Sequence, residues 1–123
     1  MKYKINDIYY SIQCEGYNTG IPMVFVRFSG CNMRCDINPG PKSPGGFKCD
    51  TEFESGQTMT LDEISRAVLK ITYNPGPCSC RWILLTGGEP ALQVDAEFVQ
   101  HFQSKRYKLA IETNGSVAVN EKI

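Results

Sequence analysis

Three cysteines are the residues whose type and spacing point most directly to chemistry. Cys31, Cys35 and Cys49 follow an apolar segment that is expected to be a buried strand. Three thiolates can hold an iron–sulfur cluster and leave one metal position without a protein ligand, and an open position distinguishes a catalytic site from a closed structural one. Cys49 also lies beyond a polar loop, where burial gives no reason for a thiol. The cysteines therefore favour a metal centre with an open position.

Zinc is the main alternative occupant of these thiolates. Cys78 and Cys80 could supply a further ligand, but the cysteine spacing does not show the paired short hooks that zinc sites usually have. Ligand count and spacing favour the cluster and leave zinc open. A disulfide framework is disfavoured, because the chain has aliphatic strands and an amphipathic helix with which to build a core.

Two further features are candidates for ligand binding. Residues 86–90, TGGEP, follow a second apolar segment, and their glycine pair lets the backbone approach a ligand closely, although a simple tight turn would also explain it. Arg27 is a charge within an apolar segment, so it needs either an internal carboxylate or an anionic ligand. His101 has nothing nearby to recruit it and is expected at the surface.

The elements that must position these residues follow from hydrophobic periodicity. Four segments rich in apolar, β-branched or aromatic residues are expected to be strands: 5–11, 23–28, 82–86 and 109–112. Two segments with apolar residues at helical spacing are expected to be helices: 60–71, opened by a capping box of Thr60 and Glu63, and 95–105. The alternation of strands and helices predicts a parallel α/β fold, in which ligands gather at the carboxyl ends of the strands. The cysteines, the glycine turn and residues 112–115 all fall at that edge.

Composition limits the classes of function. A chain of 123 residues forms one domain at most, and its 13 basic and 13 acidic residues give no net charge. That balance lacks the basic surface of a nucleic-acid binder. No apolar run is long enough to span a membrane, and residues 1–4, MKYK, lack the apolar stretch of a signal peptide. We expect a cytoplasmic protein that contacts neither nucleic acid nor membrane.

Five motifs occur in order along the chain: YSIQCEG at 10–16, VRFSGCN at 26–32, CDT at 49–51, TGGEP at 86–90 and ETNG at 112–115. Together they resemble the 7-carboxy-7-deazaguanine synthase family of the radical S-adenosylmethionine (SAM) superfamily. The resemblance implies a partial (β/α) radical-SAM barrel with a parallel sheet, with residues 1–123 as a radical-SAM domain that is incomplete at its carboxyl terminus. The chain departs from the family in the long spacing between Cys35 and Cys49, and in Cys14, where the family has glycine.

The resemblance also implies a role for each motif. A 4Fe–4S cluster would be held by Cys31, Cys35 and Cys49, and Mg²⁺ by Thr51. The other implied contacts are with SAM, at Gly88, Glu112, Thr113 and Asn114, and with a pterin substrate, at Ile12, Gln13, Cys14, Glu15, Arg27 and Thr86. No side chain is implied to act as a catalytic acid or base, because the cofactor carries the chemistry.

The implied enzyme is a lyase. It converts 6-carboxy-5,6,7,8-tetrahydropterin to 7-carboxy-7-deazaguanine by a radical ring contraction with loss of ammonia, on the route to queuosine in transfer RNA. A homodimer and an electron donor such as reduced flavodoxin are the implied partners. Two alternatives remain: a radical-SAM activase of a glycyl-radical enzyme, and a non-enzymatic zinc- or iron-binding module.

Overall fold

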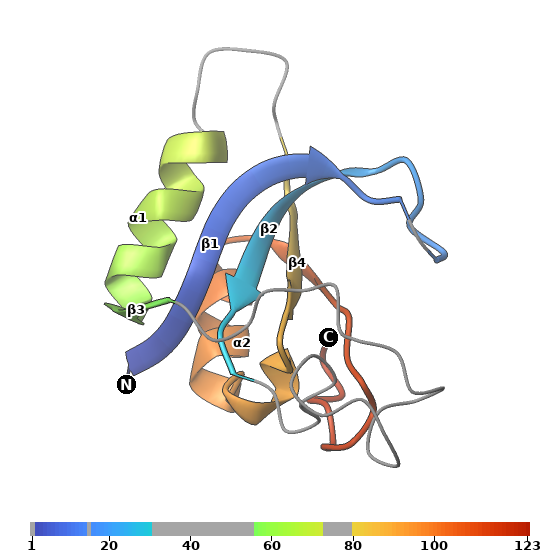
Figure 1. The fold of residues 1–123 in the computed structure, drawn as a ribbon. Coiled ribbons are helices and arrows are strands. Elements are labelled where there is room, and N and C mark those ends of the chain that lie inside the picture. Colours follow the sequence, from blue (N-terminus) through green and yellow to red (C-terminus); the bar gives the residue numbers. More distant parts are fainter. Residues whose placement is uncertain (1, 15, 31–55, 73–79) are drawn as a thin grey trace.

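A computed structural model describes residues 2–14, 16–30, 56–72 and 80–123 of the chain. Within them, five strands form one sheet and two α-helices pack against it (Figure 1). In chain order the elements are β1 (Lys2–Ile12), β2 (Pro22–Phe28), β3 (Gln57–Thr60), α1 (Leu61–Thr72), β4 (Trp82–Gly87), the 3₁₀-helix η2 (Pro90–Leu92), α2 (Ala96–Ser104) and β5 (Lys108–Ile111). The strand order in the sheet is β3-β1-β2-β4-β5.

The parallel part of the sheet confirms the expected α/β architecture. Strand β2 pairs with β4 in parallel, with Arg27 opposite Thr86, and β4 pairs with β5 in parallel, with Leu85 opposite Ile111. Helix α1 precedes β4 and helix α2 precedes β5, as the alternation of periodic segments predicted. The carboxyl ends of these three strands therefore lie along one edge of the sheet.

The other part of the sheet is antiparallel, whereas the sequence predicted a parallel sheet. Strand β1 runs antiparallel to both β2 and β3. A short turn joins β1 to β2, and a connection of that length can join only antiparallel neighbours. Strand β3 was not predicted, because its sequence QTMT contains a single apolar residue, Met59, which is buried in the core. The fold is accordingly a mixed α/β sheet.

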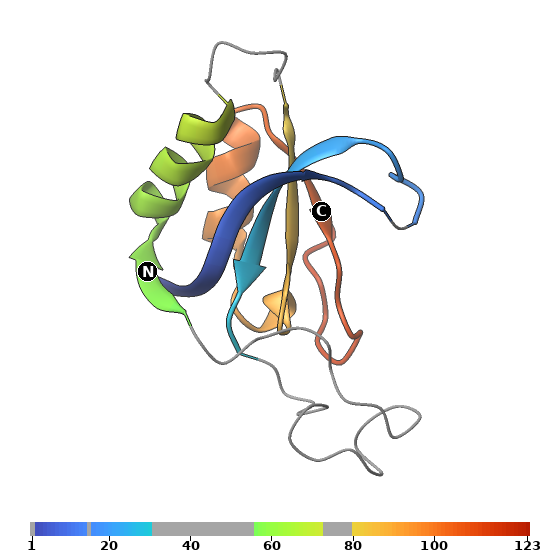
Figure 2. The same cartoon turned by 45° about the horizontal axis from the view of Figure 1, so that its top comes forward.

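The hydrophobic core lies on one face of the sheet, called here the first face. Both helices cover this face (Figures 1 and 2). Every second residue of the strands points toward the helices and packs against their apolar side chains. The main contributors are fully or almost fully buried: Tyr3, Ile5, Val24, Val26, Phe28, Ile64, Val68, Ile83, Leu85, Phe98 and Phe102. Burial of this apolar stripe fixes the register of the sheet, because a shift by one residue would turn it away from the helices.

A β-bulge in β1 decides which of its residues face the opposite, second face. The pairing of β1 with β2 passes from Ile5 opposite Phe28 to Asp7 opposite Arg27, so one residue of β1 has no counterpart. Before the bulge, odd-numbered residues such as Tyr3 and Ile5 enter the core. After it, Tyr9 lies on the second face, where its ring stacks on Phe25 with centroids 5.2 Å apart.

Both helix starts are capped, that of α1 as the sequence predicted. The Glu63 backbone N–H donates to Thr60 Oγ1 at 3.2 Å, and the Thr60 N–H donates to Glu63 Oε1 at 3.2 Å, which is the expected capping box. Asp95 caps α2 by accepting from the Phe98 N–H at 2.9 Å. Neither described helix is long and apolar enough to cross a membrane.

His101 is less exposed than its sequence surroundings suggested. His101 is half-buried beside a pocket of about 330 Å³ between α2 and the beginning of α1, and its Nε2 is buried without a hydrogen-bond partner among the described residues. The neighbouring helix covers this side of α2, which the sequence of α2 alone does not reveal. Burial lowers the pKa of His101, and Lys105 lowers it further, whereas Asp62 and Glu97 act in the opposite direction.

Candidate functional site at the second face and the carboxyl edge

Three predicted site residues meet through the carboxylate of Glu112. Thr86 Oγ1, from the end of β4, donates to Glu112 Oε2 at 3.0 Å. Gln13 Nε2, from the turn after β1, donates to Glu112 Oε1 at 3.3 Å, and the Gln13 side chain is largely buried. Each carboxylate oxygen can accept more than one hydrogen bond. Glu112 is thus a fixed acceptor that retains capacity for a ligand's N–H groups.

A pocket of about 260 Å³ opens beside this carboxylate. Its lining comes from the turn between β1 and β2, from Leu84 of β4, and from β5 with the residue after it: Gln13, Gly16, Tyr17, Asn18, Leu84, Ala110, Ile111 and Glu112. Leu84 is almost fully buried and gives the pocket an apolar floor, whereas Tyr17 is fully exposed at the turn. An apolar surface with a few fixed polar groups is typical of a small-molecule binding site.

Arg27 lies on the second face one strand away from Thr86. Its Nη2 donates to the hydroxyl oxygen of Tyr9 at 2.9 Å, and its guanidinium carbon lies 5.5 Å from the Tyr9 ring centroid. The Arg27 Nε is buried and has no hydrogen-bond partner, and no carboxylate forms an ion pair with this guanidinium within the described residues. Of the two expectations for Arg27, the internal carboxylate is therefore not found in the described part of the chain.

Glu89 ties the carboxyl ends of the parallel strands together, and sequence reasoning missed it. Its carboxylate is completely buried and accepts from the Ala91 N–H at 2.8 Å, from Thr113 Oγ1 at 2.8 Å and from the Asn114 N–H at 2.6 Å. Its own N–H donates to the Gly30 carbonyl at 2.8 Å. The Glu89 carboxylate thus joins the turn after β4 to the segment after β5. The Glu89 backbone N–H connects both of them to the residue that follows the end of β2. The sequence feature that could have indicated Glu89 is its position between a glycine pair and a proline.

The glycine pair has a steric reason as well as a positional one. Gly87 has a φ of +110°, and a Cβ there would collide with the carbonyl oxygen of Phe28 and lie 2.9 Å from Arg27 Cγ. Only glycine fits this approach of β4 to β2. The Gly88 N–H then donates to the Phe28 carbonyl at 3.0 Å, which holds the turn against the end of β2.

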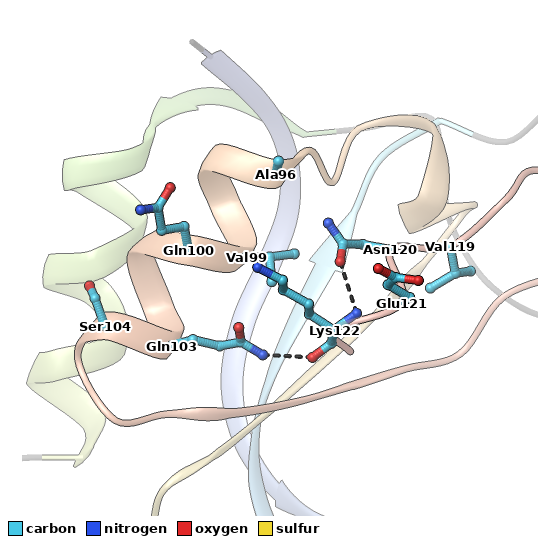
Figure 3. Close-up of a pocket in the computed structure, with 9 residues that line it drawn as sticks. All are labelled: Ala96, Val99, Gln100, Gln103, Ser104, Val119, Asn120, Glu121 and Lys122. Carbon is cyan, nitrogen blue, oxygen red and sulfur yellow. Dashed lines mark hydrogen bonds between the residues drawn. The ribbon is translucent and has the colours of Figure 1, made fainter.

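A larger pocket lies elsewhere and contains none of the predicted site residues. It has a volume of about 720 Å³ and lies between α2 and the segment 119–122 (Figure 3). Gln103 Nε2 donates to the Lys122 carbonyl at 2.6 Å across it, and the Lys122 N–H donates to Asn120 Oδ1 at 2.9 Å. Its lining combines three amide side chains, Gln100, Gln103 and Asn120, with the charged Glu121 and Lys122, and includes none of the residues implied by the motifs, so volume alone does not make it the candidate site.

Curated relatives cover the whole chain. A protein of Bacteroides thetaiotaomicron named 7-carboxy-7-deazaguanine synthase is 40% identical over 123 residues, which are 100% of this chain and 58% of the relative. Proteins of the same name from Burkholderia multivorans and Haemophilus influenzae are 34% and 35% identical, over 100% and 98% of this chain and 60% and 49% of the relatives. The chain is a homologue of 7-carboxy-7-deazaguanine synthases. It spans about half to three-fifths of the length of these relatives.

The fold agrees with this relationship. The crystal structure of QueE from Escherichia coli matches with a TM-score of 0.71 at 23% identity, over 98% of this chain and 56% of that chain. This likeness confirms a mixed α/β fold with parallel strands. No family model matches the chain.

Several site residues implied by the resemblance to 7-carboxy-7-deazaguanine synthase either lie apart from the hydrogen bonds around Glu112 or are outside the described residues. Ile12 and Cys14 are exposed, and the pairing of Ile12 with Pro22 puts the Ile12 side chain on the first face. Thr113 and Asn114 contact Glu89, whereas Glu112 lies with the predicted substrate residues. The cluster ligands and two further predicted residues lie outside the described residues: Cys31, Cys35, Cys49, Thr51 and Glu15. Among the residues described, no group of three or more ligating side chains is suited to hold a metal ion.

The position of Cys80 weakens the zinc alternative. Cys80 is buried at the amino end of β4, and its Sγ lies 3.2 Å from the carbonyl of Pro22, the first residue of β2. Gly30, which precedes Cys31 in the sequence, lies beyond the last residue of β2. About 20 Å of extended strand separates the two ends. Cys80 is therefore remote from the edge at which the cysteine segment begins, and Cys78 lies outside the described residues.

Proposed function

We propose that this chain is part of a 7-carboxy-7-deazaguanine synthase. The enzyme is a radical-SAM carbon–nitrogen lyase that acts on 6-carboxy-5,6,7,8-tetrahydropterin in the cytoplasm, and its product enters queuosine synthesis for transfer-RNA modification. Identity of 40% to a relative of that name, over the whole chain, carries the proposal. We further propose that residues 1–123 belong to a (β/α) radical-SAM barrel, to which β2, β4 and β5 contribute parallel strands.

The second face fits the two ends of such a substrate. Arg27 has a guanidinium with an unpartnered donor, which suits the substrate's carboxylate, since a guanidinium binds a carboxylate through two parallel hydrogen bonds. Glu112 offers a carboxylate to the amino group and ring N–H of the pterin's pyrimidine edge. Arg27 and Glu112 extend from strands two positions apart in the sheet, about 10 Å, which leaves room for a bicyclic ring between them.

Thr86 and Gln13 have the role of positioning Glu112. Their hydrogen bonds hold the carboxylate and occupy one acceptor site on each of its oxygens, which leaves further acceptor capacity for a ligand. Leu84 supplies an apolar surface for the ring, and the turn that carries Tyr17 lines another side of the pocket. In this arrangement the protein binds and orients the pterin and does not itself transfer a proton.

Cofactor binding belongs to the carboxyl edge. Cys31, Cys35 and Cys49 would hold the 4Fe–4S cluster, and Thr51 the Mg²⁺ ion. This proposal is supported by the described neighbours, because the Gly30 carbonyl accepts from the Glu89 N–H and Gly30, the residue before Cys31 in the sequence, is thereby held beside the glycine turn. Gly88, Thr113 and Asn114 would contact SAM. When bound, cluster and SAM supply the one-electron chemistry that starts hydrogen abstraction from the substrate. A homodimer and a flavodoxin-like electron donor complete the proposal.

Anaerobic reconstitution with iron and sulfide tests the cofactor part. We expect a brown protein with about four irons per chain. Cys31→Ala, Cys35→Ala and Cys49→Ala should each lose this iron, because a cluster with three protein thiolates has none to spare. Cys80→Ala is the matched control and should retain it. A colourless zinc protein, or loss of iron in Cys80→Ala, would contradict the assignment.

Binding of 6-carboxypterin, an oxidised and unreactive analogue of the substrate, tests the substrate part. Binding is the appropriate measurement because the chain spans only part of the length of its relatives. Glu112→Gln should weaken binding by removing the charged acceptor for the pyrimidine edge. Equal affinity of the wild-type and Glu112→Gln proteins would reject the role of Glu112, and no binding by the wild-type protein would reject the substrate class.

A further inference from the structure

Tyr9 is the residue that fixes the orientation of the Arg27 guanidinium. The two residues lie on neighbouring strands and on the same face, since Tyr9 pairs with Phe25 and Arg27 is two residues further along β2. This diagonal placement brings the Tyr9 hydroxyl oxygen to 2.9 Å from Arg27 Nη2. Apart from this bond, the described structure gives the Arg27 side chain no hydrogen-bonding or ionic partner.

The Tyr9 ring is itself held in place. It stacks on Phe25 with an interplanar angle of 29°, and it lies 5.5 Å from the guanidinium carbon of Arg27. A tyrosine has only two side-chain torsions, so this stacking leaves its hydroxyl in one position. On the other side, Gly87 lets the Arg27 side chain lie against β4, because a Cβ at that position would be 2.9 Å from Arg27 Cγ. The arginine is thus confined between Tyr9 and Gly87.

The hydrogen bond to Tyr9 leaves most of the guanidinium's capacity unused. A guanidinium has five N–H donors, and the hydroxyl oxygen accepts from one of them. The Nε is buried without a partner, which is unusual for a buried donor in a folded protein. An arginine whose plane is fixed while a donor has no acceptor is preorganised for an oxygen anion, and this lowers the entropic cost of binding.

We propose that Tyr9 is a positioning residue for anion recognition by Arg27, and that it sets the preference of the site for a carboxylated over an uncarboxylated heterocycle. This inference rests on the proposed function for the identity of the ligand. Tyr9 does not contact the reacting atoms in this proposal. It acts through Arg27, by holding the guanidinium in the orientation that a bidentate carboxylate requires.

The test compares affinities for 6-carboxypterin and pterin, which differ only in the carboxylate. Three forms of the reconstituted protein are compared: wild type, Tyr9→Phe and Tyr10→Phe. Tyr9→Phe keeps the ring and its stacking on Phe25 but removes the hydroxyl. We expect it to weaken 6-carboxypterin binding about tenfold, the effect of one hydrogen bond from a charged donor, and to leave pterin binding unchanged. Tyr10→Phe removes a hydroxyl from the adjacent residue, which faces the other way, and should change neither affinity.

The outcomes separate this inference from the proposed function. If the wild-type protein prefers 6-carboxypterin and Tyr9→Phe retains the full preference, the positioning role is refuted while the proposed substrate class stands. If Tyr9→Phe weakens both ligands equally, the residue serves structure only, and the inference is again refuted. If the wild-type protein binds neither pterin, both proposals fall. Arg27→Lys should lose the preference in either background, because an ammonium cannot bind a carboxylate through a planar fork.

Discussion

Replacing Glu89 by glutamine should loosen the carboxyl edge of the sheet. Glu89 is fully buried, and its two oxygens accept only from neutral donors: the Ala91 and Asn114 N–H groups and the Thr113 hydroxyl. Glutamine has nearly the same shape but one oxygen and one NH₂ group. In either orientation its NH₂ group faces a backbone N–H, of Ala91 or of Asn114, so one of the two bonds is lost.

The expected loss of stability follows from these contacts. A hydrogen bond to a charged group contributes about 1.5–3 kcal/mol, and a buried donor without an acceptor costs about 1–3 kcal/mol. Because the remaining oxygen of glutamine still accepts, we expect a net decrease of about 2–4 kcal/mol in the free energy of unfolding. That is a large part of the roughly 5–15 kcal/mol that stabilises a typical domain.

Urea unfolding followed by the fluorescence of Trp82, the only tryptophan, measures this change. With a slope of roughly 2 kcal/mol/M, the urea midpoint of Glu89→Gln should fall by ~1–2 M. Glu97→Gln is the matched control, because Glu97 is exposed on α2, and its midpoint should stay within about 0.3 M of wild type. A Glu89→Gln midpoint as close to wild type as that of the control would refute the view that this carboxylate holds the strand ends together.

Two further predictions concern pH and backbone fit. Burial lowers the pKa of His101 below its ordinary value of 6.5, so its neutral form stabilises the fold above that pH. This contribution should disappear as the pH falls from about 7 to about 5, and His101→Gln should show a smaller fall in urea midpoint over that interval; parallel pH profiles would contradict it. Gly87→Ala should destabilise the protein by ~3 kcal/mol or more, because left-handed strain adds to the collision with Phe28. Gly115→Ala should cost only about 1–2 kcal/mol, because Gly115 has a φ of +79° but no atom near a Cβ; equal losses in thermal unfolding would show that sterics at Gly87 are unimportant.

Local patterns in the sequence were sufficient to predict the helices and the parallel strands. The capping box of Thr60 and Glu63 and the apolar stripe after it determine α1 without reference to the rest of the chain. Strand β3 escaped prediction because QTMT has no alternating or continuous apolar pattern. It becomes a strand by pairing with the free edge of β1, which is a tertiary effect.

The candidate site was predictable only in part for a similar reason. Arg27, Thr86 and Gln13 were identified from their motifs, and the structure places them on or beside one face. Glu89 was missed because its importance depends on the meeting of three strand ends, and no local pattern reveals such a meeting. Tyr9 was missed because its face depends on a bulge that a sequence of alternating residues does not display.

Because of that bulge, the number of residues in β1 near Asn6 decides which side chains of the strand face the core and which face Arg27. Residues on both sides of the bulge belong to a single continuous strand, yet Tyr3 and Ile5 pack in the core, whereas Tyr9 contacts Arg27 on the second face. Deleting one residue there would restore regular alternation along β1. The strand could then place either Tyr3 and Ile5 in the core or Tyr9 beside Arg27, but not both. A substitution at this point keeps the number of residues in β1 and therefore its two faces, whereas an insertion or deletion of one residue exchanges them.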